Sequence, residues 1–74
     1  MSRLIRMDRT GHSTLAEWSA DDQVAYEAAV EAFRRELEEG YIGVVSEGAG
    51  QATQVDDLPR GAALVIMRRP IAGG

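Results

Sequence analysis

The chain has no cysteine and no lysine among its 74 residues. Without cysteine it can form no disulfide, and both thiol catalysis and thiolate metal sites are excluded. The absence of cysteine also fits a reducing compartment. All eight basic residues are arginine, so the α-amino group of Met1 is the only ordinary amine. The packed core must supply the stability, and at this length a core rarely contributes more than about 3–5 kcal/mol.

Positive charge is scarce, and long apolar stretches are missing. Twelve acidic residues outweigh the eight arginines and give a net charge of −4, which argues against a protein that binds nucleic-acid phosphates. No apolar run approaches the roughly 20 residues of a membrane-spanning helix, and residues 1–11 contain no cleavage signal. We therefore expect a cytoplasmic protein that binds neither nucleic acid nor a membrane.

The first 18 residues predict a β-hairpin. In residues 3–8, Ile5 and Met7 alternate with other side chains at the period of a strand. Residues 13–18 form a second strand, and Gly11 between them can take the positive φ of a tight turn. Trp18 ends this strand, and we expect its ring at the margin of the core with its indole N–H bonded to a partner.

Residues 19–40 form the clearest helix of the sequence. Ser19 or Asp21 can cap its first turn, and Gly40 is the stop signal. An apolar stripe recurs at helical spacing and is expected to face the core. Its members are Tyr26, Val30, Phe33 and Leu37, with Ala29 beside them. The glutamates of the last turn are expected to be solvated; they are Glu36, Glu38 and Glu39.

The second half of the sequence predicts three more strands. Residues 41–46 form the first, residues 47–50 a hairpin turn, and residues 51–55 a weaker strand suited to a sheet edge. Residues 56–61 are a loop, because Pro59 and Gly61 interrupt them. The last strand covers residues 62–68 and is apolar on both faces, as in the middle of a sheet. One amphipathic helix covers one sheet face, so the order predicts a two-layer α+β domain.

This order of elements resembles the β-grasp, ubiquitin-like fold, in which a mixed sheet carries one helix across one face. The stretch TGHSTLAEWSADD at residues 10–22 is similar to the first-hairpin turn, second strand and helix start of ubiquitin. The end PRGAALVIMRRPIAGG, at residues 59–74, is similar to the sulfur carriers: the small subunit of molybdopterin synthase and the thiamine-pathway carrier. The resemblance implies a β-grasp domain over residues 1–69 and a flexible C-terminal tail over residues 70–74.

In that family the C-terminal carboxylate is the reactive group. The resemblance implies that an adenylating enzyme activates Gly74 with ATP and that a downstream acceptor protein receives the activated end. The chain is then a small protein modifier or a sulfur carrier, without a bound cofactor. Gly73 and Gly74 are small enough for a narrow channel, and Pro70 lacks the N–H that would keep the segment in a sheet. The alternative is an exposed terminus without a role.

The last strand also predicts a partner surface. Alternation puts Leu64, Ile66 and Arg68 on one face, and Val65, Met67 and Arg69 on the other. The helix covers one of these faces. The other is either a surface for a partner or a second copy of the chain, or it is buried by loops. Either Ile42 and Val44 or Tyr41 and Val45 extend it. The expected partner contacts are Ile66, Arg68, Arg69 and Ile71, with the arginines facing acidic groups.

No combination of residues in the sequence indicates a catalytic or metal site. His12 is the single histidine, and it has no nucleophile beside it. We therefore expect that the protein is not an enzyme. The alternative to a carrier is a binding module or small structural subunit that uses its open sheet face and never reacts.

Overall fold

The computed structural model describes residues 1–46 and 50–70 of the chain. Its elements are β1 (Ser2–Asp8), β2 (Gly11–Trp18), α1 (Gln23–Glu38), β3 (Ile42–Ser46), β4 (Ala52–Val55) and β5 (Leu64–Arg68). Each predicted strand and the predicted helix is present, with ends shifted by a few residues. Most of the predicted turn over residues 47–50 lies outside the described residues, as does the predicted tail apart from Pro70.

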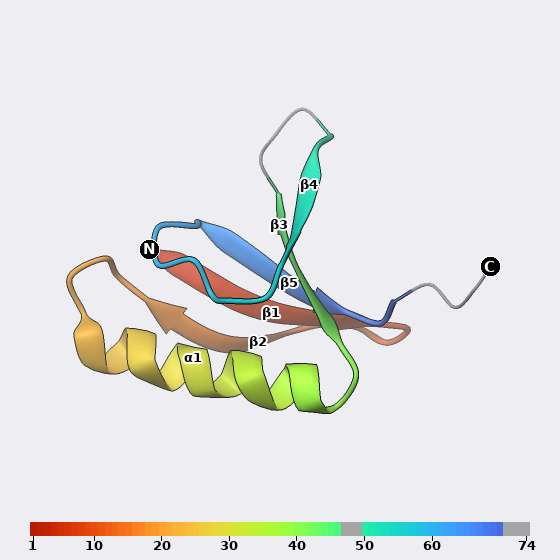
Figure 1. Cartoon of the computed structure of the whole chain (residues 1–74), viewed down its shortest axis with the longest axis horizontal. Helices are drawn as coiled ribbons and strands as arrows, with labels where there is room; N and C mark the ends of the chain where they lie inside the picture. Colours follow the sequence, from red (N-terminus) through yellow and green to blue (C-terminus); the bar gives the residue numbers. More distant parts are fainter. Residues whose placement is uncertain (47–49, 71–74) are drawn as a thin grey trace.

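The five strands form one mixed sheet in the order β2-β1-β5-β3-β4. β1 pairs antiparallel with β2 and parallel with β5, so the first and last strands lie side by side. β3 pairs antiparallel with both β5 and β4. α1 lies across one face of the sheet (Figure 1). The predicted α+β architecture is confirmed, and its topology is β-grasp-like.

Both ends of α1 are formed by specific residues, and one of them differs from the prediction. Asp22 caps the N-terminus, because its side chain accepts a hydrogen bond of 3.0 Å from the Ala25 N–H. Ser19 and Asp21 do not cap the helix; the Ser19 hydroxyl donates to the Asp21 carboxylate instead. At the other end Gly40 has a φ of +95°, which favours glycine and stops the helix as predicted.

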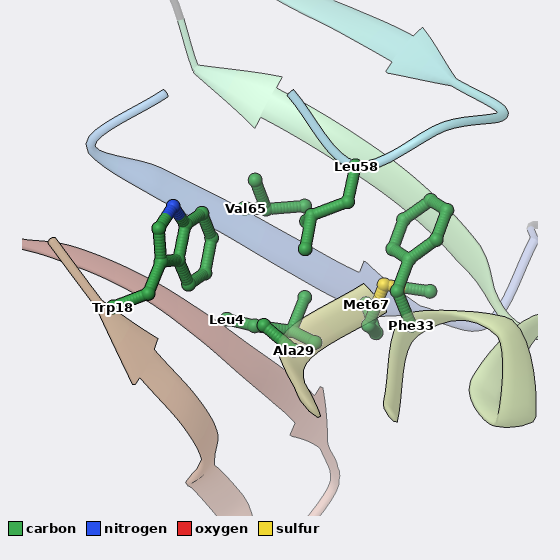
Figure 2. Close-up of a cluster of buried hydrophobic side chains, with 7 residues drawn as sticks. All are labelled: Leu4, Trp18, Ala29, Phe33, Leu58, Val65 and Met67. Atoms are coloured by element: carbon green, nitrogen blue, oxygen red, sulfur yellow. The ribbon is translucent and has the colours of Figure 1, made fainter. Parts of the chain in front are cut away.

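The core lies between α1 and the sheet (Figure 2). Phe33 is 1% exposed, which confirms the predicted register of the helix. Trp18 is also 1% exposed, so it lies inside the core and not at its margin. Its indole N–H donates to the Arg60 carbonyl at 2.9 Å, the partner that a buried indole needs. The buried cluster is completed by Leu4, Ala29, Leu58, Val65 and Met67.

The connection between β4 and β5 is packed against the helix and the core. Leu58 is buried in the core cluster, and its carbonyl accepts the Tyr26 hydroxyl. The Arg60 guanidinium lies 4.2 Å from the centre of the Tyr26 ring and donates to the Ala20 carbonyl and the Gln23 side chain. This loop therefore closes one end of the core.

The last turn of α1 contains a buried charge that the sequence analysis misplaced. Glu36 was expected to be solvated together with Glu38 and Glu39, but it is 7% exposed. Its two carboxylate oxygens each lie 3.3 Å from Nη1 of Arg6 on β1. Arg6 and Leu4 are on the helix side of the sheet, so the ion pair joins the helix to the sheet beside the core. Within the described part of the chain, no helix is long and apolar enough to cross a membrane.

Candidate functional site

The pairing of the strands shows which face of β5 is uncovered. Val65 and Met67 are fully buried, at 0% exposure, beneath α1. Leu64, Ile66 and Arg68 therefore point to the opposite face. Ile66 is directly opposite Val44, and Arg68 is directly opposite Ile42.

Directly paired residues share a face of the sheet, so Ile42 and Val44 extend the open face. Tyr41 and Val45 do not. The open face is not buried by loops in the described part of the chain, although Ile66 and Val44 are each half-covered by their neighbours. Ile5 on β1 also lies on this face, and at 7% exposure it is the most enclosed of its apolar side chains named here.

A groove of about 980 Å³ lies over this face at the end of β5. Its floor is apolar and is formed by Met7, Val44 and Ile66 from β1, β3 and β5. Met7 is 46% exposed, unusually open for a large apolar side chain. Ser46 and the residues 50–52 line the side nearest β4. The groove is therefore shaped by strands that are far apart in the sequence and adjacent in the sheet.

The rim of the groove is positively charged although the whole chain is acidic. Among the described residues that line the groove, Arg9, Arg68 and Arg69 are cationic, and Asp8 carries the one carboxylate. The rest of the chain therefore carries the excess of negative charge, because the net charge is −4. Opposite charges across an interface steer association and select partners. A surface with an apolar centre and carboxylates around it would complement this groove.

The Asp8 side chain stabilises the turn between β1 and β2. Its carboxylate accepts the Thr10 hydroxyl at 2.6 Å and the Thr10 backbone N–H at 2.8 Å. These bonds favour the ionised form, so the hydroxyl and then the backbone bond lower the pKa of Asp8. Gly11 follows with a φ of +123°, as predicted for this turn. The turn thereby holds Met7 and Arg9 beside the groove.

The predicted partner contacts divide into three groups. Ile66 and Arg68 lie in the groove, with Arg68 exposed at its rim. Arg69 lines the end of the groove, but its guanidinium lies 4.8 Å from the centre of the Tyr41 ring. Ile71, together with Gly73 and Gly74, lies outside the described residues.

Two contributors to the groove, Met7 and Arg9, were not predicted as site residues, and a third, Tyr41, was predicted only as one of two alternatives for extending the open face. Met7 could have been found, because it alternates with Arg6 and lies two residues after Ile5. No local signal marks Arg9, and alternation alone leaves open whether Tyr41 or the residue after it is on the uncovered face. Arg9 and Tyr41 reach the groove only because the β1–β2 turn and the start of β3 lie near the end of β5 in space.

The described residues contain no group of three side chains that could hold a metal ion together. His12 is exposed on the edge strand β2, where it pairs with Met7. No family model, no curated protein and no solved structure matches this chain. The likeness to β-grasp proteins therefore rests on the strand order, the strand directions and the single helix.

Proposed function

We propose that this protein is a β-grasp carrier, either a small protein modifier or a sulfur carrier, that a partner adenylating enzyme activates at the Gly74 carboxylate. The observation that carries the proposal is the position of the groove. Ile66 and Arg68 line it from the last strand, and that strand leads within six residues to the sequence Gly73–Gly74. A partner seated on the groove would hold the domain beside the segment that it modifies.

The chemistry of the groove fits a protein partner. Its apolar floor offers burial, the main source of affinity in a contact. Its exposed Arg68 can bind a carboxylate through two parallel hydrogen bonds. The activating enzyme should therefore present an apolar contact to Ile66 and Val44, with acidic side chains next to Arg68 and Arg9.

The reaction belongs to the partner enzyme, and this chain is its substrate. A Gly74 carboxylate oxygen attacks the α-phosphorus of ATP, and pyrophosphate leaves with the displaced electron pair. A sulfur nucleophile then attacks the carbonyl carbon of the acyl-adenylate, and AMP leaves. The product is a thiocarboxylate if the nucleophile is hydrogen sulfide, or a thioester if it is an enzyme thiol. A modifier would pass the acyl group on to an amine of an acceptor protein.

The composition limits what a modifier of this kind could build. Chains that branch through lysine side chains are impossible, because the sequence has no lysine. Within this sequence, a modifier is limited to single attachment or to linear attachment through an N-terminal α-amino group. A sulfur carrier needs no lysine, so the composition slightly favours the sulfur carrier over the protein modifier.

The test is to incubate the native protein with ATP and the adenylating enzymes of its source organism, and to measure its intact mass by mass spectrometry. A carrier transiently gains the mass of an adenylyl group, which is AMP less one water. With a sulfur donor it then becomes heavier by the difference between sulfur and oxygen. Deletion of Gly74 should abolish both changes, with the urea midpoint unchanged. The proposal requires a mature chain that ends at Gly74, which the mass of the protein isolated from its source measures directly. If no such enzyme adenylates that protein, the carrier proposal is wrong.

The groove also supports a second candidate, a binding module that never reacts and that pairs with a partner or with a second copy of the chain. Ile66→Asp places a charge on the groove floor and should abolish adenylation or the complex, with the fold intact. Val24→Asp is the matched control, because Val24 is 79% exposed on α1 and does not line the groove. Adenylation that is lost in Ile66→Asp and in the Gly74 deletion supports the carrier. A complex that needs Ile66 but not Gly74 supports the binding module.

A further inference from the structure

Two arginines meet the ring of Tyr41. The guanidinium carbon of Arg69 lies 4.8 Å from the ring centre, and that of Arg6 lies 5.6 Å from it. Both distances are within the range of a cation–π contact. Tyr41 belongs to the connection between α1 and β3, Arg6 to β1, and Arg69 follows β5 directly. The ring therefore joins the point where the chain leaves β5 to two other parts of the domain.

Tyr41 is itself held in place. Its backbone N–H donates to the Glu36 carbonyl at 3.0 Å, and its residue is half-buried. The Glu36 carboxylate binds Arg6 through both oxygens. The ion pair between Glu36 and Arg6 reduces a repulsion, because two cations near one ring repel each other. Glu36 offsets the charge of Arg6, and the ring can then accept the second cation, Arg69.

Arg68 and Arg69 consequently differ, although they are neighbours in the sequence. Arg68 is on the open face opposite Ile42, exposed at the rim of the groove. It is outside the aromatic contacts of the described residues, whereas Arg69 stacks on Tyr41. An arginine that is already stacked is less free to reach a partner, and it limits the directions in which its own backbone can leave the strand.

We propose that Tyr41 is a positioning residue, which holds the Arg69 guanidinium against the domain and thereby fixes the chain at Arg69, where it leaves β5. Arg68 remains as the arginine that meets the partner. This inference rests on the proposed carrier function, because a reactive carboxylate gains from a defined approach to its site. Tyr41 acts through Arg69 and touches no reacting atom.

The first measurement uses the free protein and needs no enzyme. The ¹H–¹⁵N heteronuclear NOE of the arginine Nε–H groups reports how firmly each side chain is held on the picosecond to nanosecond timescale. Arg69 should give a higher value than Arg68. The difference should persist in Tyr41→Phe, which keeps the ring, and disappear in Tyr41→Leu. Equal values for the two arginines in the unaltered protein would overturn the inference.

The second measurement is adenylation kinetics with the partner enzyme. Tyr41→Leu and Arg69→Gln should each lower kcat by about two- to fivefold, the equivalent of one exposed cation–π contact. Because both residues also line the groove, any change in KM should be by a smaller factor than the change in kcat. The double variant should be no slower than either single one, because the two residues act as a unit. Arg68→Gln should instead raise KM.

A rise in KM alone for Tyr41→Leu would also overturn the inference, since it would make Tyr41 a partner contact. Urea midpoints of all variants exclude misfolding as the cause. If no enzyme adenylates the unaltered protein, the proposed carrier function fails. The NOE comparison then decides by itself whether Tyr41 holds Arg69.

Discussion

Gly43 is the position where the smallest substitution should have the clearest effect. It lies on β3, opposite Met67 on β5 and Val55 on β4, and it faces the helix. A Cβ added there would be 2.6 Å from Cε1 and 3.0 Å from Cζ of Phe33. Carbon atoms pack best at about 3.5–4.0 Å. The Phe33 ring is 1% exposed and belongs to the buried cluster, so Gly43→Ala should overpack the core.

The expected cost combines two opposing effects. Overpacking of this kind destabilises by about 1–3 kcal/mol. Replacing glycine with alanine also reduces the entropy of the unfolded chain and returns about 0.4–1 kcal/mol. The net loss in the free energy of unfolding should be about 1–2 kcal/mol. For a domain of this size that is a large part of the roughly 3–5 kcal/mol that its core can supply.

Urea unfolding followed by the fluorescence of the buried Trp18 measures this loss. Gly61→Ala is the matched control, because a Cβ at Gly61 meets nothing within 4 Å. It keeps only the gain from the unfolded chain, so it should be more stable than the unaltered protein by about 0.4–1 kcal/mol. In the Phe33→Leu background, which removes the ring, Gly43→Ala should cost much less. A Gly43→Ala protein as stable as the unaltered one, or a cost unchanged by Phe33→Leu, would refute the reasoning.

Two further predictions concern the core and the first turn. Phe33→Ala should lower the free energy of unfolding by about 3–5 kcal/mol, because it leaves a cavity in the buried cluster. Circular dichroism at 25 °C should then show a largely unfolded chain. A folded variant whose free energy of unfolding falls by less than about 1 kcal/mol would contradict the burial of Phe33 in the core. The bonds from Thr10 lower the pKa of Asp8 in the folded state, so they stabilise the turn above about pH 4 and are lost as the pH falls through that lowered pKa. NMR titration should show Asp8 ionising below the ordinary value of about 3.9, and Thr10→Val should move its pKa back toward it; no movement would mean that the hydroxyl bond is absent.

The candidate site was only partly predictable. Ile66 and Arg68 could be placed on one face of the last strand by alternation alone, because side chains in a strand have a period of two. Alternation cannot say which of the two faces the helix covers. That required the register of β5 against β1 and β3, which brings Val65 and Met67 under α1. Alternation also placed Arg69 on the opposite face from Arg68, but it could not show that Arg69 contacts Tyr41, which precedes it by 28 positions in the sequence.

The sequence by itself determined the elements, their order and the inward face of the helix. Such features follow from local periodicity and from single residues such as Gly11 and Gly40, whose positive φ values the structure contains. Only the tertiary structure decided the burial of Glu36, because its partner Arg6 comes from a strand 30 positions earlier. An isolated helix end favours a solvated glutamate, since burying an unpaired charge is costly. The guanidinium of Arg6 on β1 reverses that preference, and no local pattern in the sequence indicates this contact.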